Sequence, residues 1–418
     1  MKATEKLVST NALLMSVSLF KILLVSLNFK YLFAFEPKTF CQNTGVDIWN
    51  FVPCDEYYQP ENCIKDEAAF TTLEDFDRCS PSYLSKLGRN YYLGASGQRE
   101  TYMENKKSYL KIKIIPQALR DVTNFSTKVT VLGTEVGYPI GFSPVGLQKL
   151  AHPDGELATI SGLQNYNGIL IMSSYATHTI EDVAERANGS SLTIWMQTYI
   201  LRNISHTLEI IRRAERSGFK ALVITADGNL NPTETCGARN GLILPQGVEV
   251  INVGKDFLTA MAPNATFDDI AFIKSRTNLP IVVKGILSTR DAIKAIHAGA
   301  SAILVSNHGG RQMDYSPATI DVLPFIVDTV KKYYPHIEVY VDGGIRNGYD
   351  IYKALARGAK MVFLGRPIVW GLAYNGSSGV NQVVDIITSE FQEVMTVSGH
   401  THPSQIVRDS ILPPFPTF

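Results

Sequence analysis

A histidine and an arginine lie three residues apart in the run Ser306-Asn-His-Gly-Gly-Arg-Gln312. Imidazole titrates near neutral pH, so His308 is a candidate general base. The planar guanidinium of Arg311 suits a carboxylate, and the two glycines between them allow the backbone to approach a flat or anionic ligand. Together these residues predict proton abstraction from an acid that carries an α-hydroxyl or α-amino group.

Two glycine-rich segments predict a phosphate site. Asp342-Gly343-Gly344-Ile345-Arg346 and Gly365-Arg366-Pro367 each follow an apolar run and each carry an arginine. Exposed N–H groups in such turns, and the helix N-termini that follow them, favour anions. The alternative is a pair of ordinary strand-to-helix turns, but the presence of the pattern in both segments favours phosphate binding.

Two further charged residues close apolar runs. Lys284 follows Ile281-Val282-Val283, where a lysine either reaches outward to water or pairs with a negative group such as an anionic cofactor ring. Asp227 closes an earlier run, and it could stabilise His308 once that residue has taken up a proton.

The elements that must position these groups form a repeating pattern. Eight short apolar runs begin at residues 139, 169, 193, 221, 280, 302, 338 and 361, and a helix-like stretch follows each run. This alternation predicts a parallel sheet covered by helices. Eight such units predict an α/β fold of the (β/α)8 barrel type, with its core at about residues 136–375. The fourth connection is the longest, so residues 228–265 are predicted to form a lid or active-site loop.

Polar residues close each of the eight runs. Since the chemistry of such barrels takes place at the C-terminal ends of the strands, these residues are the candidates for the site. They are Ser143, Ser173, Gln197, Tyr199, Thr225, Asp227, Lys284, Ser306, His308, Arg311, Asp342 and Arg366. Any one of them could be an ordinary exposed loop residue, but packing explains a whole ring of them poorly.

The composition limits the class of protein. The 418 residues include 39 Lys plus Arg and 39 Asp plus Glu, so the formal net charge is zero. A nucleic-acid-binding protein would carry an excess of basic residues, and no nucleic-acid partner is expected. Hydrophobic residues make up 45% of the chain, which is enough for a large core.

The N-terminal part of the chain follows a different pattern. In residues 1–35 an uncharged apolar run follows Lys2 and Lys6, which predicts a signal peptide or, since two more lysines interrupt the apolar stretch, a membrane anchor. Residues 36–80 are predicted to form an irregular extension. Its cysteines are Cys41, Cys54, Cys63 and Cys79. Four cysteines allow three disulfide connectivities, and the absence of Cys-x-x-Cys spacing makes a metal site the weaker interpretation.

Sites for glycosylation accompany these cysteines. The acceptor sequons are at Asn124, Asn188, Asn203, Asn264 and Asn375. Sequons, clustered cysteines and leader together predict a secreted or lumenal glycoprotein with disulfide bonds. The C-terminal tripeptide Pro416-Thr417-Phe418 is neither a peroxisomal nor an ER-retention signal.

Residues 81–418 resemble the FMN-dependent 2-hydroxy acid oxidases and dehydrogenases, the family of glycolate oxidase, lactate oxidase and flavocytochrome b2. The resemblance extends from about Tyr91 to Leu372. It depends on the Ser306–Gln312 run, both phosphate segments, Ala95-Ser96-Gly97, the segments 144–156 and 173–177, Gln197 with Tyr199, and Lys284. The leader, the cysteine-rich extension and the sequons lie outside the usual pattern of these mostly intracellular enzymes.

The resemblance implies that FMN lies at the mouth of the barrel. A 2-hydroxy acid would be oxidised to a 2-oxo acid, with oxygen as the acceptor and hydrogen peroxide as a product, and a homo-oligomer is expected. His308 would remove a substrate proton with Asp227 behind it, and Lys284 would stabilise negative charge on the reduced flavin. Tyr199 and Arg311 would bind the substrate. The implied FMN contacts are Pro144, Val145, Gly146, Ser173, Gln197, Thr225, Lys284, Ser306, Asp342, Gly343, Gly344, Arg346, Gly365 and Arg366.

The chain departs from the family pattern at two positions. The family has a tyrosine two residues before its Ala-Ser-Gly, where this chain has Leu93. An ungapped count from Asp227 places Glu234 where the family has a second substrate-binding arginine. Two alternatives to the oxidase therefore stay open. One is a flavin-binding protein with lost or redirected catalysis, and the other is a different FMN-dependent barrel reaction such as an isomerisation. His308 with Arg311 favours oxidation, whereas Leu93 and Glu234 favour the binding protein.

Overall fold

The computed structural model describes residues 70–228 and 242–412. The leader, Cys41, Cys54, Cys63, Glu234 and the C-terminal tripeptide lie outside these ranges, so the predictions made for them concern residues that the structure does not describe.

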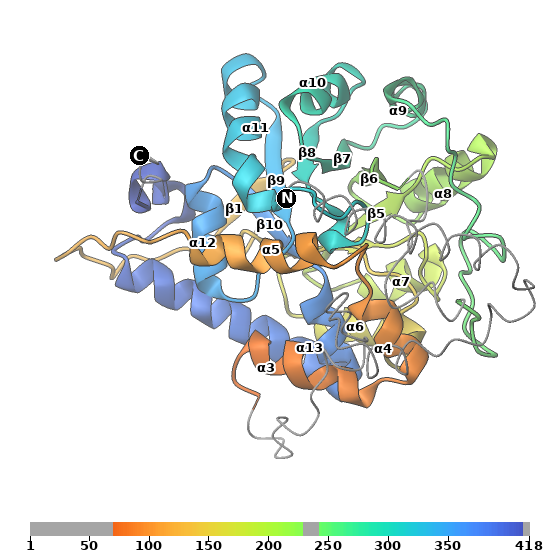
Figure 1. The fold of residues 1–418 in the computed structure, drawn as a ribbon, viewed down its shortest axis with the longest axis horizontal. Coiled ribbons are helices and arrows are strands. Elements are labelled where there is room, and N and C mark those ends of the chain that lie inside the picture. The colour runs from red at the N-terminus through yellow and green to blue at the C-terminus, as the bar shows by residue number, and fades with distance from the viewer. Residues whose placement is uncertain (1–69, 229–241, 413–418) are drawn as a thin grey trace, which may run out of the picture. The chain divides into compact units, whose positions relative to one another are not determined.

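Eight parallel strands close into a barrel (Figure 1). They are β3 (Ile140–Phe142), β4 (Ile169–Met172), β5 (Thr193–Thr198), β6 (Leu222–Thr225), β7 (Ile281–Ile286), β8 (Ala302–Val305), β9 (Glu338–Asp342) and β10 (Met361–Leu364). Each strand pairs with the next along the chain, and β10 returns to β3, with Val362 opposite Ile140. Every predicted apolar run supplies one strand, and the predicted (β/α)8 barrel is confirmed.

Helices follow the strands and surround the barrel (Figure 1). They are α6 (Gly155–Gly162), α7 (Ile180–Ala187), α8 (Ile204–Arg216), α9 (Phe267–Lys274), α10 (Thr289–His297), α11 (Thr319–Tyr333), α12 (Gly348–Ala356) and α13 (Arg366–Val397). Polar side chains mark where several of them begin: Thr179, Ser288 and Asn347 each accept a hydrogen bond from the backbone N–H three residues on. Such caps satisfy N–H groups that the first turn of a helix leaves unpaired.

The interior of the barrel is closed at the N-terminal ends of the strands. The hairpin of β1 (Val129–Val131) and β2 (Thr134–Val136) places Val131 and Val136 in the same buried cluster as Ile169, Trp195 and Met361. Ile169 and Met361 are the first residues of their strands. The C-terminal ends of the strands are therefore the end that remains for a binding site.

Among the described residues, four short helices precede the β1–β2 hairpin and the barrel. They are α3 (Leu73–Cys79), the 3-10 helix η4 (Ser80–Tyr83), α4 (Lys86–Leu93) and α5 (Glu100–Leu110). Helix α3 was assigned from sequence to the extension, but it packs on α13: Phe76 stacks edge-on against Tyr374, and the indole Nε1 of Trp370 donates to Asp77. Within the described ranges, no helix is both long and apolar enough to cross a membrane.

Candidate active site

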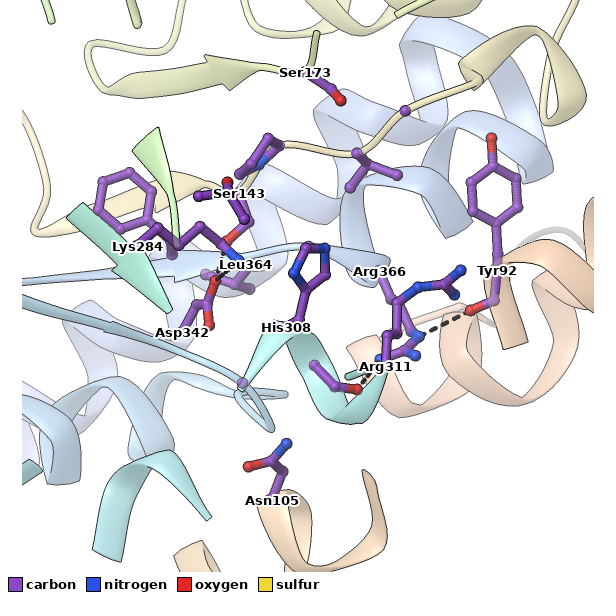
Figure 2. Close-up of a pocket in the computed structure, with 18 of the residues that line it drawn as sticks. Tyr92, Asn105, Ser143, Ser173, Lys284, His308, Arg311, Asp342, Leu364 and Arg366 are labelled. Carbon is purple, nitrogen blue, oxygen red and sulfur yellow. Dashed lines mark hydrogen bonds and ion pairs between the residues drawn. The ribbon is translucent and has the colours of Figure 1, made fainter. Parts of the chain in front are cut away.

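A pocket opens at the C-terminal ends of the strands. The structure brings most of the predicted site residues into its wall. Those predicted to contact FMN and found there are Pro144, Val145, Gly146, Ser173, Gln197, Thr225, Lys284, Asp342, Gly343, Gly344, Arg346, Gly365 and Arg366. Tyr199, His308 and Arg311 line it as well. Figure 2 shows the ring of His308 between the Lys284–Asp342 pair and the side chains of Arg311 and Arg366.

Ser306 was predicted to contact the cofactor, but it is fully buried and does not line the pocket. Its hydroxyl accepts a hydrogen bond from the backbone N–H of His308 at 3.1 Å. The side chain therefore shapes the turn that presents His308, which explains its position without a direct contact to a ligand.

His308 and Asp227 form the pair expected of a base and its partner. The imidazole Nδ1 lies 3.0 Å from the Asp227 Oδ1, and Asp227, unlike His308, does not line the pocket. Burial alone would raise the pKa of Asp227, but His308 and Lys284 outweigh it and hold the pKa below its usual value. His308 has a φ of 58°, in the left-handed region that is uncommon for residues other than glycine and recurs at functional sites.

Lys284 and Asp342 form a second buried pair. The Lys284 Nζ lies 3.7 Å from the Asp342 Oδ2, which also accepts a hydrogen bond from the Ser143 hydroxyl at 3.0 Å. The other carboxylate oxygen, Oδ1, is buried and has no hydrogen-bond partner among the described residues. A buried carboxylate oxygen of this kind is an acceptor that a hydroxyl-bearing ligand can satisfy.

Side-chain amides and hydroxyls fix the strand ends on the opposite side of the barrel. Gln197 donates from Nε2 to the Thr225 hydroxyl at 3.0 Å and accepts from the backbone N–H of Ser174 at 3.0 Å. The Ser173 hydroxyl accepts from the backbone N–H of Tyr175. Because these groups hold one another in place, the polar wall is already formed in the protein alone.

Arg311 and Arg366 are both positioned by the end of helix α4. Arg311 donates from Nη1 to the carbonyl oxygen of Tyr91 at 2.7 Å, and Arg366 donates from Nε to that of Tyr92 at 2.9 Å. The last carbonyls of a helix are unpaired and carry the negative end of its dipole, which favours cations there. Burial, together with the neighbouring Arg311 and Arg346 and against the opposing effect of Tyr102, lowers the pKa of Arg366 to about 10.

Tyrosines form the wall on the substrate side. Tyr91 lies beneath the guanidinium of Arg311, 5.1 Å from it, and Tyr175 packs against both Tyr199 and Phe257. Burial raises the pKa of Tyr199, and Tyr175 and Asp227 add to the effect. The Tyr199 hydroxyl is therefore protonated at neutral pH and can donate a hydrogen bond.

The interpretation of Leu93 as a missing tyrosine is wrong. Leu93 belongs to the buried core and does not line the pocket, whereas Tyr91 and Tyr92 do. The position two residues before Ala95-Ser96-Gly97 is the last residue of α4, and its side chain packs into the core. The site therefore has tyrosines on this side.

The segments after β9 and β10 fit a phosphate-bearing cofactor. Gly344 has a φ of 84°, and a Cβ there would lie 2.1 Å from the carbonyl oxygen of Asn105, so only glycine allows this close turn. Arg346 and Arg366 supply two buried cations, and the Arg346 Nε has no hydrogen-bond partner among the described residues. Buried donors without partners beside a glycine turn fit an anionic group such as the phosphate of FMN.

Several pocket residues were not predicted from the sequence. Tyr91, Tyr92, Tyr102, Asn105 and Lys106 line the pocket but belong to α4 and α5. In a (β/α)8 barrel, site residues are expected at the C-terminal ends of the strands. That expectation does not extend to the helices that precede the barrel, so their pocket residues could not be identified from it.

Comparison with known proteins decides the family. The family described as FMN-dependent dehydrogenase matches residues 82–413. The protein belongs to this family. 2-Hydroxyacid oxidase 1 of Mus musculus is 39% identical over 346 residues, covering 78% of this chain and 92% of the relative. A peroxisomal (S)-2-hydroxyacid oxidase of Arabidopsis thaliana is 38% identical over 352 residues, covering 81% of this chain and 95% of the relative. The crystal structure of mandelate oxidase with benzoyl-formic acid superposes with a TM-score of 0.76 at 33% identity and covers 82% of this chain and 98% of that one.

These comparisons confirm the predicted family, the FMN cofactor and the class of reaction, FMN-dependent oxidation of a 2-hydroxy acid. They contradict the predicted compartment. Two of the relatives, both (S)-2-hydroxyacid oxidases of Arabidopsis thaliana, are named as peroxisomal. The prediction of a secreted or lumenal protein is therefore wrong, and the predicted signal peptide and glycosylation depended on that compartment.

Proposed function

We propose that this pocket oxidises a 2-hydroxy acid to the 2-oxo acid, with oxygen as the final acceptor and hydrogen peroxide as the second product. Bound FMN supplies the two-electron acceptor. The observation that carries the proposal is the His308–Asp227 pair. With Nδ1 held by the carboxylate, the second ring nitrogen of His308 is left to act in the pocket that the residue lines.

In this proposal His308 takes up a substrate proton at Nε2, and Asp227 stabilises the resulting imidazolium. Asp227 suits that role because its lowered pKa keeps it ionised, and because a buried charge acts through a lower effective dielectric than water. Its buried Oδ2 has no hydrogen-bond partner among the described residues. The negative charge is therefore not shared with another donor there.

Arg311 and Tyr199 would bind the carboxylate of the substrate. The hydrogen bonds of Arg311 to backbone carbonyls fix one Nη group, so the planar guanidinium is held at a defined angle. A fixed fork of this kind loses little entropy when a carboxylate binds. The aromatic wall of Tyr91, Tyr175 and Tyr199 supports 2-hydroxy acids with an apolar substituent as substrates.

Anaerobic mixing with a panel of 2-hydroxy acids tests the proposal. Substrate should bleach the bound flavin, and re-admitted oxygen should restore its colour with release of hydrogen peroxide. The variant His308→Ala should retain flavin but reduce it about 10²- to 10⁴-fold more slowly, the usual contribution of a general base. If no acid bleaches the flavin of the unaltered protein, it is a flavin-binding protein without this activity.

We also propose a disulfide within the cysteine cluster. Cys79 is the last residue of α3 and is buried, and this position next to the cysteine-rich segment supports a link from α3 to that segment. The mass of the unreduced protein should increase by about two hydrogens per disulfide on reduction, and peptide mapping would identify the partner of Cys79. The N-terminal membrane anchor and the homo-oligomer stay predictions.

A further inference from the structure

Four side chains meet beside the phosphate end of the pocket. The Asp77 Oδ2 of α3 lies 2.5 Å from the Lys106 Nζ of α5. Its Oδ1 lies 3.1 Å from the Arg346 Nη2 and accepts a hydrogen bond from Trp370 Nε1 at 2.8 Å. Burial alone would raise the pKa of Asp77, but Arg346 and Lys106 outweigh it and hold the pKa well below the usual range. Asp77 is therefore a buried carboxylate anion.

Lys106 is connected to both predicted phosphate arginines. It shares Asp77 with Arg346, and it shares the ring of Tyr102 with Arg366. The Lys106 Nζ lies 5.8 Å from the centre of that ring, and the Arg366 guanidinium lies 4.7 Å from it. The residues of this group that line the pocket are Tyr102, Lys106, Arg346 and Arg366. Three cations thus converge at one end of it.

The charges of this group do not balance in the protein alone. Lys106, Arg346 and Arg366 contribute three positive charges, and Asp77 contributes one negative charge, so an excess of two positive charges remains. The exposed Glu74, 4.0 Å from Lys106, is screened by water and offsets little of it. A phosphate monoester carries about −1.5 to −2 at neutral pH, which is close to the excess.

We propose that Lys106 is a third cation of the FMN phosphate site and that Asp77 is its built-in counter-anion. Asp77 neutralises part of the charge when no phosphate is present, and it limits the excess that the phosphate must balance. Asp77 lies ahead of the matched residues 82–413, so the assignment comes from the contacts in this chain. The inference depends on the proposed placement of the FMN phosphate between Gly343–Arg346 and Gly365–Arg366.

Flavin fluorescence titration of cofactor-free protein with FMN and with riboflavin tests this inference. Riboflavin lacks the phosphate, so the ratio of the two dissociation constants isolates the contribution of the phosphate. Lys106→Met should weaken FMN binding about 10- to 100-fold, the range for a charged contact, and leave riboflavin binding within about 2-fold. The matched control is Lys107→Met, which changes the exposed neighbour on the same helix and should leave the ratio unchanged.

Asp77→Asn tests the counter-anion in the opposite direction. Because one negative charge is lost, this variant should prefer FMN over riboflavin more strongly than the unaltered protein does. The riboflavin affinity of each variant also reports whether the pocket is still folded, and Lys106→Gln provides a second, polar replacement.

The outcomes separate this inference from the placement of the phosphate. If Arg366→Ala lowers the preference for FMN and both Lys106 variants leave it unchanged, Lys106 is not part of the site and the inference is overturned. If Arg366→Ala also leaves the preference unchanged, the phosphate does not lie between the two segments. A lower preference for FMN in Asp77→Asn would overturn the counter-anion role.

Discussion

Replacing Asp227 by Asn separates the charge behind His308 from its hydrogen bond. The two side chains are nearly isosteric, and the amide oxygen can still accept from the imidazole Nδ1, which lies 3.0 Å from the Asp227 Oδ1. What the variant loses is the negative charge that opposes the imidazolium formed when His308 takes up a proton. We expect the flavin to be reduced more slowly while both flavin and substrate still bind.

The size of this effect follows from the distance and the burial. Two unit charges about 4 Å apart attract by about 4 kcal/mol at the effective dielectric of a protein site. The side chains of His308 and Asp227 are 22% and 13% exposed, so some of the attraction is screened and about 2–4 kcal/mol remains. That range corresponds to a rate of flavin reduction about 30- to 1000-fold lower.

Stopped-flow absorbance under anaerobic conditions measures this rate directly. The substrate concentration is varied so that binding and reduction are separated, and Asp268→Asn, which alters an exposed carboxylate in α9, serves as the control. An unchanged limiting rate in Asp227→Asn would refute the electrostatic role of Asp227. A higher substrate dissociation constant with an unchanged rate would instead place Asp227 in substrate binding.

Three further predictions follow from the buried groups. Leu93→Tyr should lower the melting temperature and leave acid turnover no better, because Leu93 is buried in the core; improved turnover of glycolate would contradict this. Asp77→Asn should destabilise cofactor-free protein by about 3–5 kcal/mol at pH 7, since it leaves buried cations unpaired. Because the folded pKa of Asp77 is lowered, its stabilisation is present above the unfolded pKa of about 3.9 and is lost below it. The two proteins should therefore converge in chemical denaturation as the pH falls below that value. Tyr175→Phe removes the hydrogen bond to the Phe257 carbonyl oxygen and should speed proteolysis within residues 242–265, whereas an unchanged cleavage rate would show that this bond does not hold the segment.

The barrel could be predicted from the sequence because each strand is a short apolar run, which can be recognised from its own residues alone. The eight strands are buried along nearly their whole length, as in β4, β6, β8 and β10, so their signal does not depend on neighbours. The polar residues at the strand ends could be predicted for the same reason. Their position in the pocket follows from the closure of the barrel.

The contribution of the helices before the barrel could not be predicted in this way. Arg311 contacts Tyr91 across 220 positions in the sequence, and Trp370 contacts Asp77 across 293. Such contacts arise from the docking of α3, α4 and α5 on the barrel, for which a local pattern carries no information. The expectation that Leu93 replaces a substrate-site tyrosine was wrong for the same reason. Only the packing of α4 shows that Leu93 faces the core while Tyr91 and Tyr92 line the pocket.

Helix α5 supports both chemically important loops of the site. The side-chain amide of Asn105 exchanges two hydrogen bonds with that of Asn307, at 2.9 and 2.8 Å, next to His308. A Cβ on Gly344 would lie only 2.1 Å from the carbonyl oxygen of Asn105. Gly310, with a φ of 77°, approaches so closely that a Cβ there would lie 2.7 Å from the backbone nitrogen of Tyr102. The loop that carries His308 and the loop after β9 therefore both pack against this one helix, which lies outside the barrel.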